Sequence, residues 1–129
     1  MKQIEVVAAV LSNDAHAIFC AQRKNVGELA LKWEFPGGKI EPGETDQEAL
    51  IRELKEELSV EIEVLSWIQT VQHQYQTFHL TMHAYHARIK RGSITLHEHP
   101  NALWLPKSAL MSLDWAAADL PIVKALMKG

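Results

Sequence analysis

Cysteine is almost absent from this sequence. Cys20 is the only one among 129 residues, so no disulfide can form within the chain. Disulfides occur mostly in oxidising compartments, whereas a lone thiol suits a reducing one. We therefore expect a cytoplasmic protein.

Long hydrophobic stretches are also missing. No apolar run approaches the roughly 20 residues that a membrane-spanning helix needs. The chain begins Met-Lys-Gln-Ile-Glu-Val-Val, which contains an acidic residue and resembles the start of a strand rather than a signal peptide. We expect no membrane partner.

Neither sign of charge dominates the composition. The chain has 13 Lys and Arg residues against 16 Asp and Glu residues, a formal net charge of −3, and no basic stripe. Proteins that bind a nucleic-acid polymer need clustered cationic side chains, so we do not expect such a partner. A small anionic ligand that arrives with its own metal ion is compatible with this balance.

The chain also lacks internal repeats, low-complexity tracts and linkers. Its length fits one domain that can bury a sizeable core, so we expect a single domain over residues 1–129. No feature of the sequence specifies an oligomeric state.

Hydrophobic patterning and turn residues predict the order of the elements. The apolar run 6–11 indicates a buried strand, Asn13 and Asp14 indicate a turn, and residues 15–22 indicate a second strand in a hairpin with the first. A loop is expected at 24–32, a short strand at 33–35 and a Pro-Gly-Gly loop at 36–38. A helix is expected from the capping box of Thr45 and Glu48 to about residue 58. After it we expect strands at 60–71 and 77–88, extended pieces at 94–97 and 102–105, and short helices at 106–111 and 121–127. Together they predict an α+β domain with a mixed sheet and at least two helices.

The most informative stretch is residues 38–60, where a glycine-rich loop leads into an acidic helix. Glu53, Glu56 and Glu57 are spaced i, i+3 and i+4, so their side chains share one helical face. Three carboxylates repel each other unless a cation lies among them, and oxygen ligands suit hard cations such as Mg²⁺ or Mn²⁺. Without the glycine-rich loop, a solvated acidic face would be the better interpretation.

The same stretch resembles the box of the Nudix hydrolase family. That box reads Gly, five residues, Glu, seven residues, Arg-Glu, an aliphatic residue, any residue, Glu-Glu, any residue, Gly and an aliphatic residue. The matching residues here are Gly38, Glu44, Arg52, Glu53, Leu54, Glu56, Glu57 and Val60. Ser59 stands where the box has its last glycine. If that residue is left-handed, serine costs about 1 kcal/mol there, and no ligand is lost.

The resemblance implies a Nudix fold, an α/β/α sandwich with a mixed central sheet across which the box forms a loop, a helix and a second loop. It also implies attack by water on a phosphorus of a diphosphate linkage, with Mg²⁺, or Mn²⁺, bound by Glu53, Glu56 and Glu57. A backbone carbonyl near Gly37 or Gly38 is a further implied metal ligand. The general base is either Glu53 or a carboxylate from outside the helix.

Three residues around the helix complete the implied catalytic set. Arg52 is expected to orient the glutamates through a charge-assisted pair, and Glu44 to support the same network. Glu98 falls where similar enzymes have a glutamate that approaches the metal, although a polar surface loop is an equal alternative. Of the histidines, His97 and His99 flank Glu98, and we expect most histidines to lie on the surface rather than to bind zinc.

The similarity extends over almost the whole chain to MutT-like enzymes and to the subgroup called CTP pyrophosphohydrolases. It implies that Asp119, just before the last helix, reads the base, although a carboxylate at a helix start is equally consistent. Arg23 and Lys39 are candidate contacts to sugar or phosphate. Phe35 or Trp115 is expected to stack on the base. Three other aromatic residues are expected in the core, namely Trp33, Phe78 and Trp104.

These patterns predict a pyrophosphohydrolase that converts a nucleoside triphosphate and water to the monophosphate and pyrophosphate. The first expected substrate class is an oxidised or modified nucleotide such as 8-oxo-dGTP. The alternatives are CTP, dCTP or 5-methyl-dCTP, and, ranked lower, a nucleotide sugar or ADP-ribose. A nucleotide sensor without catalysis is the alternative of another class, and the presence of all three helix glutamates argues against it.

Overall fold

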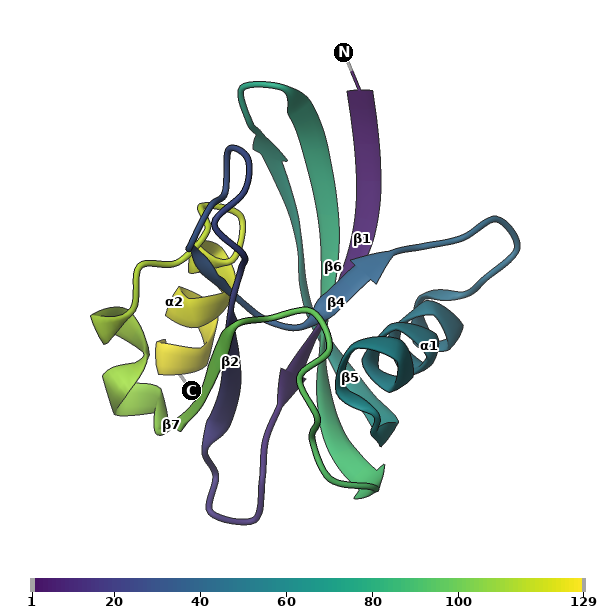
Figure 1. Cartoon of the computed structure of the whole chain (residues 1–129), viewed down its shortest axis with the longest axis vertical. Helices are drawn as coiled ribbons and strands as arrows, with labels where there is room; N and C mark the ends of the chain where they lie inside the picture. The colour runs from purple at the N-terminus through teal and green to yellow at the C-terminus, as the bar shows by residue number, and fades with distance from the viewer. Residues whose placement is uncertain (1, 129) are drawn as a thin grey trace.

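A computed structural model describes residues 2–128, so Met1 and Gly129 of the expected domain lie outside the described part (Figure 1). In chain order the elements are β1 (Lys2–Leu11), β2 (Ile18–Gln22), β3 (Trp33–Glu34), β4 (Gly37–Lys39), α1 (Asp46–Leu58), β5 (Glu61–Gln74), β6 (Phe78–Arg91), β7 (Asn101–Leu105), a 3-10 helix η1 (Lys107–Ser112) and α2 (Leu120–Lys128). No helix within residues 2–128 is long and apolar enough to cross a membrane.

The strands form two sheets. One has the order β4-β1-β6-β5, in which β1 and β6 are parallel and the other pairs antiparallel. The second is antiparallel, with the order β3-β2-β7. The expectation of a mixed sheet is confirmed, but a second sheet accompanies it. The expected hairpin of the first two strands is wrong, because β4 and β6 occupy both edges of β1 and leave only one bridge, from Ser12 to Ile18.

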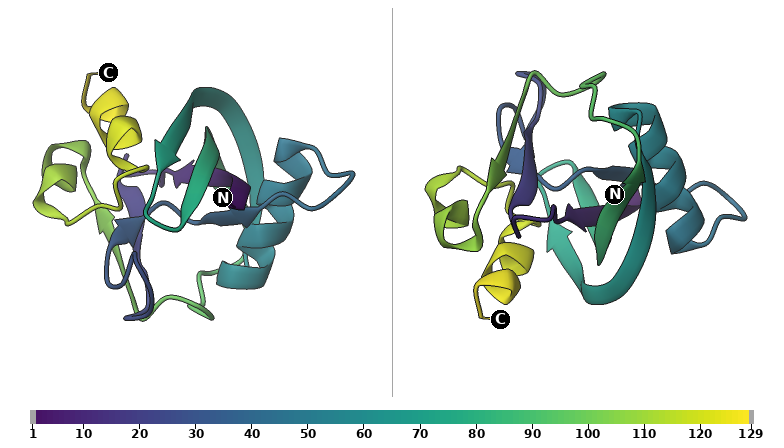
Figure 2. Two further views of the ribbon diagram at one scale, coloured as in Figure 1. Left: turned by 90° about the horizontal axis from the view of Figure 1, so that it is seen from above. Right: turned by 90° about the horizontal axis from the view of Figure 1, so that it is seen from below.

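Alternate residues of β1 face two separate cores. Val7, Ala9 and Leu11 pack on the side of α1, together with its buried leucines. Ala8 and Val10 pack on the other side, together with the apolar face of α2. Full burial of one large aliphatic side chain stabilises a fold by about 1.5–3 kcal/mol, so both helices are held by their apolar faces. The strands therefore lie between α1 and α2, which confirms the expected sandwich (Figure 2).

Helix α1 begins at the predicted capping box. The Thr45 hydroxyl accepts a hydrogen bond from the Glu48 amide at 3.1 Å, and the Glu48 carboxylate accepts one from the Thr45 amide at 2.8 Å. The helix ends at Ser59, whose φ of 59° and ψ of 34° are left-handed. This is the conformation that favours glycine, so the cost expected at this departure from the box is present.

The two glycines of the Pro-Gly-Gly segment belong to a strand, not to the loop that the sequence predicts. β4 pairs with β1, with Gly37 opposite Ala8 and Gly38 opposite Val7. A Cβ atom on Gly37 would lie 1.9 Å from the Val7 carbonyl oxygen, so the missing side chain lets the two backbones approach.

Most later elements are confirmed, with shifted ends. β5 and β6 each run for 14 residues, two more than expected. The segment 94–97 is not a strand, because it bonds to a helix end instead: the Thr95 amide donates to the Leu58 carbonyl at 2.9 Å, and the His97 amide donates to the Glu57 carbonyl at 3.1 Å. These bonds satisfy two carbonyls at the end of α1 that the helix itself leaves unpaired.

Candidate active site

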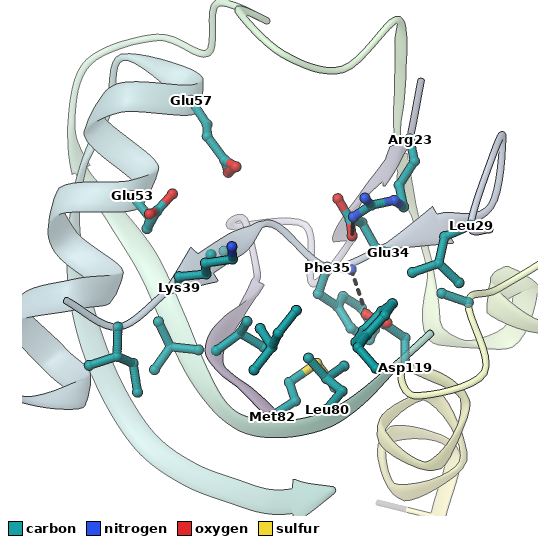
Figure 3. Close-up of a pocket in the computed structure, with 18 of the residues that line it drawn as sticks. Arg23, Leu29, Glu34, Phe35, Lys39, Glu53, Glu57, Leu80, Met82 and Asp119 are labelled. Carbon is teal, nitrogen blue, oxygen red and sulfur yellow. Dashed lines mark hydrogen bonds and ion pairs between the residues drawn. The ribbon is translucent and has the colours of Figure 1, made fainter. Parts of the chain in front are cut away.

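A cavity of about 640 Å³ lies between α1 and the loop that follows β2 (Figure 3). This volume is within the range of pockets that hold small molecules. Its lining changes character from one end to the other, with carboxylates of α1 at one end and aromatic and aliphatic side chains at the other. A smaller cavity of about 390 Å³ shares four of its lining residues, Arg23, Glu34, Glu53 and Glu57, and adds Glu56 and Glu98.

Glu53 and Glu57 project from α1 into this space (Figure 3). Burial, and then the nearby charges of Glu53, Glu34 and Glu98, raise the pKa of Glu57 from 4.5 to about 8. Burial also raises the pKa of Glu53, and hydrogen bonding from Arg52 opposes that rise. Within residues 2–128, the buried Oε2 of Glu57 has no hydrogen-bond partner. Such carboxylates repel one another and would be stabilised by a cation.

Gly38 makes room for the Glu53 carboxylate. A Cβ atom at Gly38 would lie 2.4 Å from the Cδ and Oε2 atoms of Glu53. Any side chain at this position would therefore displace the carboxylate, which explains in physical terms why the sequence has glycine here.

The donor chemistry fits a hard divalent cation, since the side chains present are carboxylates and one carboxylate oxygen is buried without a partner. Among residues 2–128, however, no three His, Cys, Asp or Glu side chains converge as a ligand group. Glu56 and Glu98 are exposed and turn toward cationic neighbours, with Glu56 3.4 Å from Arg52 and Glu98 3.4 Å from Lys24. The structure thus brings all four expected carboxylates to one region, where Glu53, Glu56 and Glu98 are each paired to a cation.

Arg52 contacts four of the expected site residues, including Glu56. Its Nε and Nη2 donate to the two oxygens of Glu44 at 2.6 and 2.8 Å, and its Nη1 donates to Glu53 at 2.9 Å. Nη2 also donates to the Lys39 carbonyl at 3.0 Å. The hydrogen bonds from Arg52, followed by one from the Glu41 amide, lower the pKa of Glu44 to about 2. The arginine therefore links the loop before α1 to a carboxylate that faces the cavity.

Asp119 lies in the lining at the opposite end. Its Oδ2 accepts a hydrogen bond from the Phe35 amide at 3.0 Å, and only 5% of the residue is exposed. Burial, and then the charge of Glu34, raise its pKa well above the usual value. Its backbone carbonyl, rather than its carboxylate, accepts from the amides of Ile122 and Val123 at the start of α2. The carboxylate therefore fixes the cavity wall rather than the helix start.

Arg23, Lys39 and Phe35 also line the cavity, as expected for substrate contacts. Arg23 is half-buried and Lys39 exposed. Phe35 is buried, and its ring packs on Trp115 with a centroid distance of 4.7 Å. Trp115 is not among the residues of the lining.

Two polar residues of this region were not predicted as site residues. Glu34 accepts from Arg23 at 2.9 Å through one oxygen and pairs with His99 Nε2 at 2.8 Å through the other. The expectation of a surface histidine is wrong for His99, because only 8% of it is exposed. The position of Glu34 between Trp33 and Phe35, directly before the glycine segment, is the one sequence signal that could have identified it.

The aromatic residues also differ from expectation. Phe78 lines the cavity and packs on Tyr75 with a centroid distance of 4.9 Å, so it is not only a core residue. Trp104 is 37% exposed and meets Phe19 edge-on at 5.3 Å, so the prediction of a core position is wrong. Trp33 is partly buried against the core on the side of α2.

The chain was compared with known proteins. The family model described as NUDIX domain matches residues 6–125. The chain is 38% identical over 127 residues to a protein named CTP pyrophosphohydrolase from Escherichia coli K12, covering 98% of this chain and 93% of the relative. It is 28% identical over 128 residues to the 8-oxo-dGTP diphosphatase of the same organism, covering 99% of both chains.

A solved structure supports the same relationship. The solution structure of the E. coli ORF135 protein superposes with a TM-score of 0.84 at 37% sequence identity, covering 99% of this chain and 91% of that one. The names of the two relatives describe enzymes that act on nucleoside triphosphates, which confirms the class of enzyme predicted from the sequence. Because the family model and these full-length similarities agree with the geometry of α1 and the glycine strand β4, the chain belongs to the NUDIX domain family.

Proposed function

We propose that this protein is a Mg²⁺-dependent, cytoplasmic nucleoside triphosphate pyrophosphohydrolase formed by a single Nudix domain. The observation that carries the proposal is one cavity with Glu53 and Glu57 at one end and Asp119 and aromatic side chains at the other. Phosphates with their cation suit the acidic end, and a base suits the apolar end.

The proposed reaction needs a nucleophile, a base and neutralised phosphates. When bound, Mg²⁺ supplies positive charge and Lewis acidity among Glu53, Glu56, Glu57 and Glu98. Water forms a bond to one phosphorus while the bond from that phosphorus to the bridging oxygen breaks. Glu53 or a carboxylate from outside the helix, such as Glu98, takes the proton of the water, and pyrophosphate leaves with the bridging electrons.

Arg52 and Glu44 act on this chemistry indirectly. The forked contact between them holds the guanidinium, and the guanidinium in turn holds the Glu53 carboxylate at 2.9 Å. A group held in one orientation loses less entropy when the transition state forms. We assign both residues a positioning role.

Arg23 and Lys39 are assigned to sugar or phosphate, and Phe35 with Asp119, at the other end, to the base. Both 8-oxo-dGTP and cytosine nucleotides remain candidate substrates. The cytosine class is favoured by one observation, the 38% identity to a protein named for CTP against 28% to the one named for 8-oxo-dGTP.

The experiment is a pyrophosphate-release assay with Mg²⁺ and 8-oxo-dGTP, dGTP, CTP, dCTP, 5-methyl-dCTP and ADP-ribose. Glu53→Gln serves as the catalytic control, and Glu61→Gln serves as a matched control because Glu61 pairs with Arg91 at the start of β5. We expect turnover of at least one triphosphate, abolished in Glu53→Gln and retained in Glu61→Gln. A folded wild-type protein that binds nucleotides with Mg²⁺ but hydrolyses none would contradict the proposal and favour the sensor.

A further inference from the structure

Glu28 joins two segments that are far apart in the sequence. Its carboxylate accepts hydrogen bonds from the Gln76 amide at 2.6 Å, the Thr77 amide at 3.2 Å and the Thr77 hydroxyl at 3.0 Å. Glu28 lies in the loop after β2, and Gln76 and Thr77 form the turn between β5 and β6. Both segments lie at the same end of the molecule, at the top of Figure 1. We call this set of three hydrogen bonds the Glu28 clamp.

The two segments that the clamp joins both contribute to the lining of the cavity. Leu29, the next residue after Glu28, is part of the lining (Figure 3). Tyr75 and Phe78, which flank the two donors, are also part of it. A change in the distance between Glu28 and the β5–β6 turn therefore changes the spacing between Leu29 and the wall that Tyr75 and Phe78 form.

The wall formed by Tyr75 and Phe78 is also connected to Asp119, the polar residue at the same end of the cavity. Tyr75 accepts a hydrogen bond from the Ala118 amide at 2.9 Å, and Ala118 precedes Asp119. The Tyr75 ring also packs on Phe78. The clamp thus joins the loop after β2 to a segment that is also bonded to the residue before Asp119.

The contacts of Glu28 are those of an ionised acceptor. Although the residue is exposed, its pKa is lowered, first by the Gln76 amide and also by the hydroxyl and amide of Thr77. Hydrogen bonds to an ionised carboxylate are about twice as strong as neutral ones. An amide side chain at this position would keep one acceptor oxygen and lose the charge.

We propose that Glu28 is a positioning residue that determines base specificity, because it sets the spacing between Leu29 and the Tyr75–Phe78 wall. This inference rests on the proposed function in one respect, the placement of the base at this end of the cavity. Glu28 is not among the lining residues of either cavity, so its effect is on binding and on discrimination between bases rather than on the chemical step.

The test compares Glu28→Ala, Glu28→Gln and Thr77→Val with Glu63→Gln, whose carboxylate pairs with Arg88 away from the cavity. Two measurements are made: KM and kcat for dCTP, dGTP and 8-oxo-dGTP, and metal-free binding of the corresponding monophosphates by calorimetry. For Glu28→Ala we expect KM and Kd of the preferred base to rise about tenfold, with kcat within about twofold of wild type. Glu28→Gln and Thr77→Val should lie between Glu28→Ala and wild type.

The ratio of Kd values between disfavoured and preferred bases should fall in Glu28→Ala. Hydrogen exchange at the Gln76 and Thr77 amides should become faster, while the melting temperature stays close to that of Glu63→Gln. Equal changes in Kd for every base, or no change beyond that of Glu63→Gln, would overturn the inference. Failure of the proposed function would be seen separately, as wild-type protein that binds monophosphates but releases no pyrophosphate. Wild-type protein that binds no monophosphate would overturn both.

Discussion

Arg52 holds Glu44 through a forked contact, with Nε at 2.6 Å from Oε2 and Nη2 at 2.8 Å from Oε1. Both residues were predicted to act as one network, and the geometry brings them together as a bidentate pair. Such a pair depends on the planar shape of the guanidinium, which an ammonium group cannot reproduce.

The first prediction therefore concerns Arg52→Lys. Lysine keeps the charge but loses the fork, so Glu53 is held less firmly and kcat should fall by roughly ten- to a hundredfold, as expected for a loss of about 1.4–2.8 kcal/mol. KM should change much less, and steady-state kinetics separates the two. The matched control is Arg88→Lys, which alters an exposed ion pair with Glu63. A fall in kcat that is no larger than in this control would contradict the positioning role.

The second prediction concerns Glu57 and metal. Since the pKa of Glu57 is raised to about 8, the folded protein binds this proton more tightly than the unfolded chain does, and stability is lost as pH rises from 4.5 through 8. Glu57→Gln should therefore melt higher than wild type in EDTA, by a margin that grows toward pH 9. Thermal melting across this range, with Glu61→Gln as control, measures the margin.

Addition of MgCl₂ tests whether Glu57 contributes to the metal site. A cation that binds only the folded protein raises its melting temperature. Wild type should show this rise, and EDTA should reverse it, whereas Glu57→Gln should show a smaller rise. An equal rise in both proteins would mean that Glu57 does not contribute to the metal site.

The third prediction concerns Glu44, whose contribution to stability changes with pH in the opposite direction to that of Glu57. The Arg52 hydrogen bonds lower the pKa of Glu44 from 4.5 to about 2, so stability from the ionised group is present above pH 4.5 and is lost as pH falls toward 2. Glu44→Gln should melt below wild type at pH 6, and the two should converge near pH 2. Asp14→Asn, at an exposed turn, is the control. A constant difference between Glu44→Gln and wild type over the whole range would count against this linkage.

The fourth prediction concerns Ser59, the one departure from the Nudix box. Its left-handed backbone costs about 1 kcal/mol relative to glycine, but its hydroxyl lies 2.7 Å from His97 Nε2. An exposed hydrogen bond of this kind contributes about 0.5 kcal/mol, at the low end of the usual range. Ser59→Gly should therefore change the free energy of unfolding by less than about 1 kcal/mol, because the two effects oppose each other.

A double-mutant cycle separates these two effects. In a His97→Ala background the bond is already absent, so Ser59→Gly should stabilise by about 1 kcal/mol. Ser59→Ala keeps the left-handed cost without the hydroxyl and should destabilise the wild type by about 0.5 kcal/mol. Urea denaturation gives the free energy of unfolding of the four proteins of the cycle and of Ser59→Ala. An identical effect of Ser59→Gly in both backgrounds would show that the contact with His97 contributes nothing.

The predictions from the sequence were correct where the interacting residues are close together in the chain. The capping box of Thr45 and Glu48, the left-handed end at Ser59 and the shared face of Glu53 and Glu57 all depend on residues a few positions apart. Periodicity and spacing carry this information directly. The start of α1, its end and the acidic side of the cavity could therefore be predicted.

The failures involve partners that are distant in the sequence. Gly38 belongs to a strand only because β1 offers it an edge, and no property of a Pro-Gly-Gly segment indicates that edge. Likewise, the burial of His99 depends on Glu34, which lies 65 positions earlier. Side chains of this type are usually exposed, and only the folded arrangement of the chain shows that these two meet.

The amide bonds from residues 95 and 97 to the last carbonyls of α1 have one more consequence. The segment that carries Glu98 is bonded on one side to the helix that carries Glu57. On the other side it is bonded to the β3-β2-β7 sheet, because the adjacent His99 pairs with Glu34 of β3. A shift of that sheet relative to α1 would therefore be transmitted to the spacing between the carboxylates of Glu57 and Glu98.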